Sequence, residues 1–317
     1  MRALLAVVAV LLISTPVFSQ DYPNRPIRFV TFGAAGTASD VLVRAIGKRL
    51  SEKLGQPVIV DNKPGADGLI AGGDVAKSAP DGHTLFFASN SPIAAVPALR
   101  KSIPYDPMKD FTPITMVGYY TFFLYANPNV PARTLGELIA YAKANPGKLS
   151  YGSGNTTGSV GASQIATMAG IKMVHVPYKG EPQAMVDLLA GRIDLMIATL
   201  TTGLSHVNSG KLRAIVTTLK ERYPGLPDVP TIYEAGLPQY TITSWGGMFG
   251  PANMPKDVVA RLNKEFVEIL KEPEIIELLG KQGFVLTPST PEELGKFLGE
   301  QIEAWKASAR AAGMEPE

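Results

Sequence analysis

The stretch with the clearest capacity for binding chemistry is FGAAGTASD, which runs from Phe32 to Asp40. It follows an apolar run of strand character and opens a run with helical spacing. Small residues let the backbone come close to a ligand, and the first N–H groups of a helix have no partner inside the helix. With the positive end of the helix dipole, they form a site for an anion. The same residues also suit a tightly packed strand-to-helix turn, in which Thr37 and Asp40 form a capping box, and the stretch alone does not separate the two.

A second stretch, YGSGNTTGS from Tyr151 to Ser159, repeats this arrangement later in the chain. It lies between a strand expected over 149–152 and a helix expected over 159–169. Its glycines come near the spacing of a dinucleotide-binding loop, but the third falls one place late and no acidic residue ends the next strand to hold a ribose. A nucleotide site is therefore disfavoured. The two hydroxyl-rich loops indicate two lobes that close on one polar ligand.

Other polar residues follow expected strands. Ser89, Asn90 and Ser91 come directly after a strand expected over 84–88, where they are placed to line a cleft. Tyr178, in the stretch VPYKGEP, is placed either to flank a ligand or to lie in a surface turn. Ligands of open α/β sheets bind beyond the carboxyl ends of the strands, which is where all these side chains are expected.

Signatures of catalysis and of metal binding are sparse. The chain has no serine in a G-x-S-x-G elbow and no G-x-x-x-x-G-K-[ST] loop. Its three histidines are scattered, and it has no cysteine. We expect His175 to be a core or near-core residue and Asp40 to be a helix cap. An exported enzyme that uses Asp40 with His83 or His175 is the least favoured interpretation, and neither a metal nor a cofactor is expected.

The N-terminal segment MRALLAVVAVLLISTPVFSQ has one arginine, an unbroken apolar run from Ala3 to Ile13 and then small residues. This is the layout of a secretory signal peptide over residues 1–20, and its apolar run is shorter than the roughly 20 residues of a membrane span. We therefore expect the protein to be exported. A net charge of +2 over 317 residues gives no electrostatic footprint for nucleic acid.

Strand-like and helix-like runs alternate along the chain, which predicts an α/β fold with parallel sheets. The length exceeds what one core usually supports, so two domains are expected. Two apolar, aromatic segments, Tyr119–Ala126 and Tyr240–Gly250, interrupt the alternation, and we interpret them as strands that cross between the domains. The predicted domains are then a discontinuous one over 21–121 plus 247–317 and a continuous one over 122–246, with a ligand cleft between the two lobes.

Longer stretches follow one another along nearly the whole chain after residue 20: YPNRPIRFVTFGAAGTASD, KLGQPVIVDNKPGADGLIAGGDVAKSAPDGHTL, YDPMKDF, HVPYKGEPQAMVDLLAGRIDLMI, SGKLRAIVTT and LPDVPTIYEAGLP. In this order they resemble the Bug family, the periplasmic receptors of tripartite tricarboxylate transporters. The resemblance implies a two-domain, type II-like periplasmic-binding fold that closes on a small organic carboxylate. It also implies a periplasmic location and membrane subunits of a transporter as partners; we expect a monomer.

In that family, backbone amides, hydroxyls and ordered water hold the ligand's carboxylates. Carried over by position, the first loop supplies Gly33, Ala34, Ala35, Gly36, Thr37, Ser39 and Asp40, and the second supplies Ser153, Gly154, Asn155, Thr156 and Thr157. This chain has Ala198 and Thr199 where many members have an acidic residue and asparagine, so Thr199 joins the candidate site. Both loops depart from the commonest family form, which leaves the identity of the carboxylate open. Ligand sensing for a membrane signalling protein requires the same closure, and the sequence does not separate that role from transport.

Overall fold

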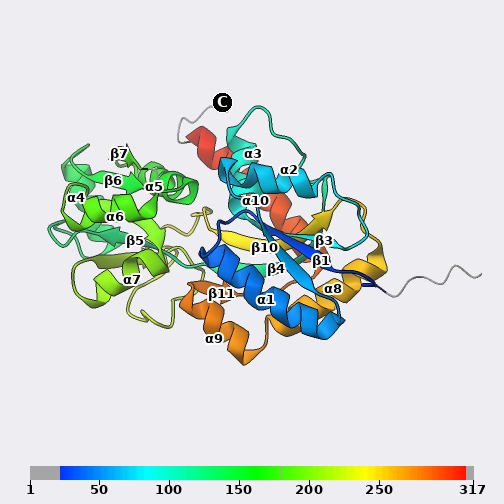
Figure 1. Cartoon of the computed structure of the whole chain (residues 1–317). Helices are drawn as coiled ribbons and strands as arrows, with labels where there is room; N and C mark the ends of the chain where they lie inside the picture. The colour runs from blue at the N-terminus through cyan, green and yellow to red at the C-terminus, as the bar shows by residue number, and fades with distance from the viewer. Residues whose placement is uncertain (1–21, 179, 312–317) are drawn as a thin grey trace, which may run out of the picture.

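The computed structural model describes residues 22–178 and 180–311, which form two α/β lobes lying side by side (Figure 1). The expected signal peptide over residues 1–20 lies outside the described residues and stays a prediction. Within the described ranges, no helix has the length and apolar character needed to cross a membrane.

The first lobe is built on a six-stranded sheet of mixed direction. Its strands in spatial order are β11 (Phe284–Leu286), β4 (Phe111–Tyr120), β10 (Trp245–Pro251), β3 (Thr84–Ser89), β1 (Ile27–Thr31) and β2 (Val58–Asn62). The three strands nearest the N-terminus pair in parallel, as expected where helices connect successive strands. β10 runs antiparallel between β3 and β4, so segments from both ends of the chain share one sheet.

Helices cover both faces of this sheet. They are α1 (Ala38–Leu54), η1 (Ala66–Gly68), α2 (Leu69–Val75), η2 (Ser91–Ala95), α3 (Val96–Leu99), α8 (Lys256–Ile269), α9 (Pro273–Lys281) and α10 (Pro291–Ala311). Successive side chains of a strand point to opposite faces. In β1, Phe29 accordingly packs in a buried cluster with α1 and α8, and Val30 packs in another with α2 and α10.

The second lobe has a five-stranded sheet. Its strands in spatial order are β7 (Val174–Pro177), β6 (Ser150–Ser153), β8 (Leu195–Thr199), β5 (Phe122–Ala126) and β9 (Arg213–Thr217). Its helices are α4 (Leu135–Ala144), α5 (Thr156–Ala169), α6 (Glu181–Leu189) and α7 (Leu200–Asn208). The predicted two-lobe α/β class is confirmed. The core position predicted for His175 is wrong, because β7 forms an edge of the sheet and leaves this side chain exposed.

The lobes join where β4 ends and β5 begins, with Thr121 alone between the two strands. The Thr121 N–H donates to the carbonyl of Gly283 in the first lobe (2.7 Å), and its carbonyl accepts from the N–H of Leu200 in the second (2.8 Å). The crossover strand predicted over 240–250 is wrong in its first part, because only Trp245–Pro251 pairs, and it does so in the first sheet. The domain boundaries remain a prediction, which the sheet membership of these strands supports.

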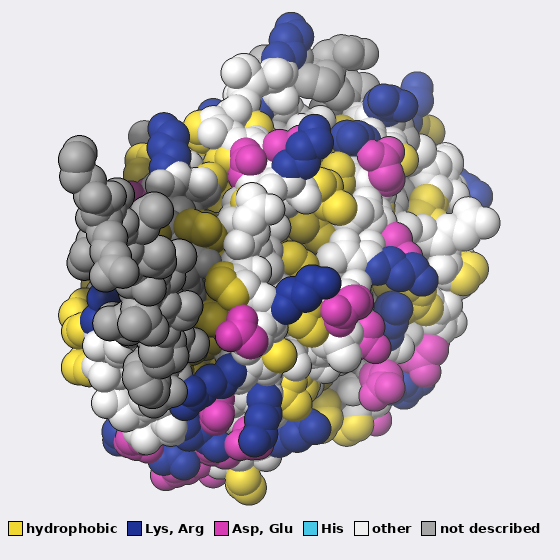
Figure 2. Space-filling view, turned by 90° about the vertical axis from the view of Figure 1, so that its right-hand side faces the viewer, with side chains coloured by type: hydrophobic (Ala, Val, Ile, Leu, Met, Phe, Trp, Pro, Cys, Tyr) yellow, Lys and Arg dark blue, Asp and Glu magenta, His cyan; other side chains and the backbone are white. Residues whose placement is uncertain are grey.

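The face of the molecule shown in Figure 2 carries basic and acidic side chains interspersed, rather than in a broad area of one sign. Charges are also paired between elements of the first lobe. Arg49 of α1 contacts Glu272, which precedes α9, at 2.6 Å, and Lys53 of α1 contacts Glu268 of α8 at 2.9 Å. Exposed pairs of this kind contribute little to stability, but they keep opposite charges mixed on the surface.

Gly118 marks a place where β4 comes too close to β11 for a side chain. A Cβ added there would lie 2.1 Å from the carbonyl oxygen of Val285, and φ is 153°. We expect Gly118→Ala to lower the free energy of unfolding by about 1–3 kcal/mol, because the two backbones must separate. Gly280→Ala in α9, where an added carbon meets no heavy atom within 4 Å, should be neutral or stabilising. Urea denaturation measures both variants, and equal stabilities would contradict the close approach.

Candidate functional site

A hollow of about 360 Å³ lies between the lobes, a size that suits a small organic ligand. The first lobe borders it with the carboxyl ends of β1 and β3 and the start of α1, and the second lobe borders it with the starts of α5 and α7. Its lining consists of Phe32, Thr37, Ala38, Ser39, Gly65, Asp67, Gly68, Ser89, Asn90, Ser91, Tyr120, Phe122, Asn155, Thr156, Thr157, Thr199 and Ser244.

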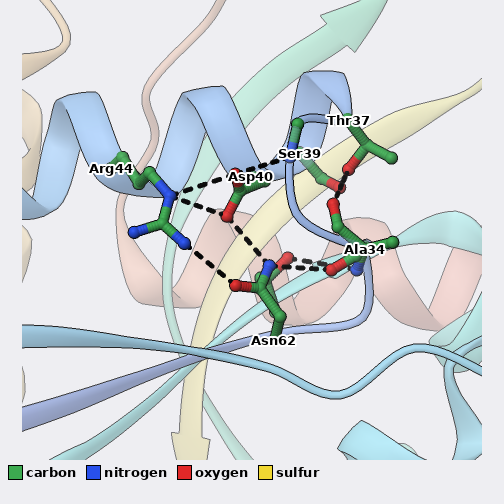
Figure 3. Close-up of polar contacts among 9 residues, drawn as sticks. Ala34, Thr37, Ser39, Asp40, Arg44 and Asn62 are labelled. Atoms are coloured by element: carbon green, nitrogen blue, oxygen red, sulfur yellow. Dashed lines mark hydrogen bonds and ion pairs between the residues drawn. The ribbon is translucent and has the colours of Figure 1, made fainter.

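The start of α1 is held differently from the expected capping box. The Thr37 hydroxyl donates to the Ala34 carbonyl (2.7 Å) and makes no cap to the helix, whereas the Asp40 carboxylate accepts from the Gly36 N–H (2.8 Å) (Figure 3). The predicted box is therefore wrong. The Thr37 side chain therefore accepts no hydrogen bond from the N–H groups in the first turn of α1. This turn lies at the hollow.

Asp40 is buried next to this turn and is not part of the lining. Arg44 Nε donates to it at 3.0 Å and Asn62 Nδ2 at 2.9 Å, in addition to the Gly36 N–H (Figure 3). Burial raises the pKa of a carboxyl group, but the hydrogen bonds from Arg44, Gly36 and Asn62 outweigh it and lower the pKa of Asp40 to about 2. The ionised carboxylate of Asp40 is engaged by these three donors and thereby holds the loop in place.

A buried carboxylate also organises the second lobe. Glu181, the first residue of α6, accepts from Asn155 Nδ2 (2.6 Å), the Thr199 hydroxyl (2.6 Å) and the Thr202 hydroxyl (2.7 Å). Asn155 in turn caps α5, because its Oδ1 accepts from the Gly158 N–H at 2.8 Å. These donors to Glu181 are uncharged. They tie the loop before α5 to the start of α7.

The two lobes contact each other at the hollow. α5 begins at Thr156 rather than at the expected residue 159, so Thr156 and Thr157 lie in its first turn and line the hollow. The Asn90 amide donates to the Thr157 hydroxyl at 3.3 Å, and Asn90 Oδ1 accepts from the Ser244 hydroxyl at 2.9 Å. All three side chains of this chain of hydrogen bonds are buried. A group from the first lobe thus fixes the orientation of a hydroxyl from the second.

The structure brings one part of the predicted site together around the hollow: Thr37, Ser39, Ser89, Asn90, Ser91, Asn155, Thr156, Thr157 and Thr199. Another part is absent from the lining: Gly33, Ala34, Ala35, Gly36, Asp40, Ser153, Gly154 and Tyr178. Ser153 Oγ is hydrogen-bonded to His175 Nε2 (2.7 Å), and the Tyr178 hydroxyl donates to Asp187 (2.7 Å). The part that all these residues play in ligand binding stays a prediction.

Two of the predicted glycines act through their neighbours. A Cβ at Gly33 would lie 1.9 Å from Ser39 Oγ, which belongs to the lining. A Cβ at Gly154 would lie 2.1 Å from the backbone nitrogen of Glu181, whose side chain holds Asn155 and Thr199. Either side chain would displace a group that forms or supports the wall.

Sequence reasoning missed several lining residues: Phe32, Ala38, Gly65, Asp67, Gly68, Tyr120, Phe122 and Ser244. A signal existed for the stretch KPGADG, which follows β2 as the other loops follow their strands. Residues 65–68 all have positive φ, between 47° and 118°. Tyr120 and Phe122 belong to the segment predicted to cross between the domains, and the change of sheet at Thr121 brings them to the hollow.

The structure separates the residues of the least favoured, enzymatic interpretation. β1 and β3 are parallel, and Asp40 follows the carboxyl end of β1, whereas His83 precedes β3 at the opposite edge of the sheet. His175 lies in the second sheet. Among residues 22–178 and 180–311, no three His, Asp or Glu side chains form a group that could hold a metal ion.

Two α/β lobes with helix starts from both facing one polar hollow define the class of two-lobe solute-binding proteins. The chain belongs to the TctC family, described as the tripartite tricarboxylate transporter family receptor, which matches residues 42–314. It is 35% identical to protein BugT of Bordetella pertussis, over 99% of this chain and 98% of BugT. The family membership predicted from the sequence is confirmed.

Solved structures show the same fold. An R. palustris protein determined with adipate is 31% identical with a TM-score of 0.80, covering 94% of this chain and 100% of that one. MatC of Rhodopseudomonas palustris, determined with bound malate, is 29% identical with a TM-score of 0.72, covering 90% and 99%. These receptors share both lobes with this chain.

The low pKa of Asp40 makes stability depend on pH. Because the folded-state pKa of about 2 lies below the ordinary value of 3.8, ionised Asp40 stabilises the fold above about pH 4, and the contribution is lost as the pH falls through 2. The shift corresponds to about 2 kcal/mol. We expect the difference in unfolding free energy between wild type and Asp40→Asn to shrink by about this amount between pH 5 and pH 2 in urea titrations.

Asp228→Asn, at an exposed position, is the matched control for the general effect of removing one negative charge. If the difference for Asp40→Asn varied with pH only as much as that for Asp228→Asn, the hydrogen bonds around Asp40 would not be stabilising its ionised form.

Proposed function

We propose that this receptor binds a small organic carboxylate in the hollow and delivers it to the membrane subunits of a tripartite transporter. The observation that carries the proposal is that α1 and α5, from different lobes, both start at the hollow, and that its described lining contains no lysine or arginine. N–H groups and hydroxyls are then the donors for an anion. The relatives determined with adipate and malate support a carboxylate as the ligand.

The location and assembly of the protein form part of the same proposal. Removal of residues 1–20 as a signal peptide would release the receptor into the periplasm, where a transporter's outer face is accessible. The protein would act as a monomer and without catalysis, since Asp40 is held as a loop-positioning carboxylate and lies apart from His83. Membership in a family of transporter receptors supports transport as the role.

The expected strength of binding follows from the donors. A helix start contributes roughly 0.3–1 kcal/mol when exposed and up to about 2 when partly buried. Micromolar affinity needs about 8 kcal/mol, so several neutral hydrogen bonds and contact with the rings of Phe32, Tyr120 and Phe122 must supply the remainder. Affinity in the micromolar range is consistent with such a site.

A thermal-shift screen tests the proposal directly. The protein is unfolded and refolded to remove any carried ligand, and then heated with di-, tri-, aromatic and amino-acid carboxylates. A ligand at about a hundred times its dissociation constant adds about 2.7 kcal/mol to stability, which gives a clear shift. Amides of the same carbon skeletons are the control, because they lack the charge. Stabilisation by no carboxylate in the panel would refute the proposal.

Thr157→Val tests whether the hollow is the site. The change keeps the shape of the side chain but removes the hydroxyl that accepts from the buried Asn90 amide and lines the hollow. We expect the carboxylate found in the screen to bind roughly 2- to 10-fold more weakly by calorimetry, because the ligand loses a hydroxyl donor worth about 0.5–1.5 kcal/mol. Thr167→Val, at an exposed position of the same helix, should bind normally. Equal affinities in the two variants would place the ligand elsewhere.

A further inference from the structure

Asp67 is the one charged side chain among the described residues that line the hollow. The others are glycine, alanine, serine, threonine and asparagine residues and three aromatic rings. An acidic group in a hollow of this kind works against a ligand with negative charge at both ends. It attracts a ligand that carries a cation or a hydrogen-bond donor at one end.

The backbone conformation at Asp67 favours glycine over aspartate, so local geometry does not account for an aspartate at this position. Its φ is 54° and its ψ is 28°, which lies in the left-handed helical region that glycine adopts without steric cost and that other residues adopt with strain. Aspartate tolerates this region better than most residues, but glycine would fit it without strain. Strain of this kind at a cleft motivates a search for a functional cause.

The loop that carries Asp67 is fixed against the wall of the hollow. The Gly68 N–H donates to the Gly65 carbonyl at 3.0 Å. A Cβ at Gly68 would lie 2.9 Å from a carbon of Pro92 and 3.2 Å from Cβ of Phe32, so the backbone is packed closely on both. The position of Asp67 at the hollow therefore follows from contacts that do not involve its carboxylate.

Arg100, after α3, is the cation nearest to the carboxylate of Asp67 among its described ion pairs, at 3.5 Å. The two side chains are 44% and 54% exposed, and pairs so exposed interact weakly. Asp67 lines the hollow and Arg100 does not. A ligand in the hollow thus meets the carboxylate rather than the guanidinium.

We propose that Asp67 selects ligands by the polar group at the end opposite to their carboxylate. The hollow prefers a carboxylate whose other end bears an amino group, or failing that a neutral hydrogen-bond donor, to a dicarboxylate. The carboxylate end lies at the starts of α1 and α5, the middle contacts Phe32, Tyr120 and Phe122, and the donor end lies at Asp67. This inference rests on the proposed function. It sets the chain apart from the relatives determined with adipate and malate, which are dicarboxylates.

The test compares wild type with Asp67→Asn across three groups of ligands. The probes are amino carboxylates (4-aminobutanoate, 6-aminohexanoate, glutamine), monocarboxylates (butanoate, hexanoate) and dicarboxylates (succinate, malate, adipate), measured by thermal shift and, for hits, by calorimetry at pH 7. Asparagine tolerates the same φ and has nearly the same shape as aspartate. The variant therefore changes the charge and keeps the backbone.

We expect the wild type to rank amino carboxylates first and dicarboxylates last. In Asp67→Asn, amino carboxylates should bind roughly tenfold more weakly and dicarboxylates several-fold more tightly, the effect of one unit charge at about 6 Å with an effective dielectric constant of about 40. Asp67→Gly should show the same change in ranking with a higher melting temperature, because it also removes the backbone strain.

Each other outcome overturns the inference. A wild type that prefers a dicarboxylate, or a ranking that Asp67→Asn leaves unchanged, removes Asp67 as the selecting group. If Arg100→Gln weakens dicarboxylate binding, Arg100 turns into the hollow and reads a second carboxylate. In these cases a carboxylate is still bound, so the proposed function is retained and only the inference about Asp67 is refuted. If no carboxylate in the wider screen or in this series binds, both the proposed function and the inference are refuted.

Discussion

A cleft lined by neutral donors holds an anion only if those donors are oriented before the ligand arrives, since the cost of ordering them would otherwise reduce affinity. In both lobes a buried carboxylate provides this order. Asp40 accepts from Gly36, Arg44 and Asn62, and Glu181 accepts from Asn155, Thr199 and Thr202. Neither carboxylate lines the hollow. Each carboxylate accepts hydrogen bonds from donors in the loops around it and so holds those loops in place. The orientation of the donors that line the hollow therefore depends on two residues that do not line it themselves.

The sequence predicted the fold class and the family because those depend on patterns along the chain, namely the alternation of elements and small residues after strands. It located the start of α1 for the same reason, but it placed the start of α5 at residue 159 rather than at Thr156. It was wrong about the capping box, because the Thr37 hydroxyl donates to the Ala34 carbonyl instead of capping α1. It did not anticipate that Ser153 is hydrogen-bonded to His175 and Tyr178 to Asp187. The aromatic pattern of Tyr119–Ala126 predicted a crossover between the lobes, but not that Tyr120 and Phe122, on either side of the change of sheet, both line the hollow.

Family membership and ligand choice depend on different residues of this chain. Two buried clusters pack against the first sheet, one of which extends into the second lobe, and relatives at about 30% identity share the overall fold. The lining of the hollow comes from loops and first helical turns, where substitution costs the fold little. A receptor family can therefore keep one architecture while the side chains that line the hollow differ.

Thr121 has a mechanical consequence. Its N–H is held by the first lobe and its carbonyl by the second, and it stands alone between strands of different sheets. The chain changes sheet here and again between β9 and β10, so a rotation of one lobe against the other would have to be absorbed at these two connections, and a small angle there would become a larger displacement at the tips of the lobes. A membrane partner that touches both tips would sense occupancy as a change in the span between them, and would need no contact with the solute itself.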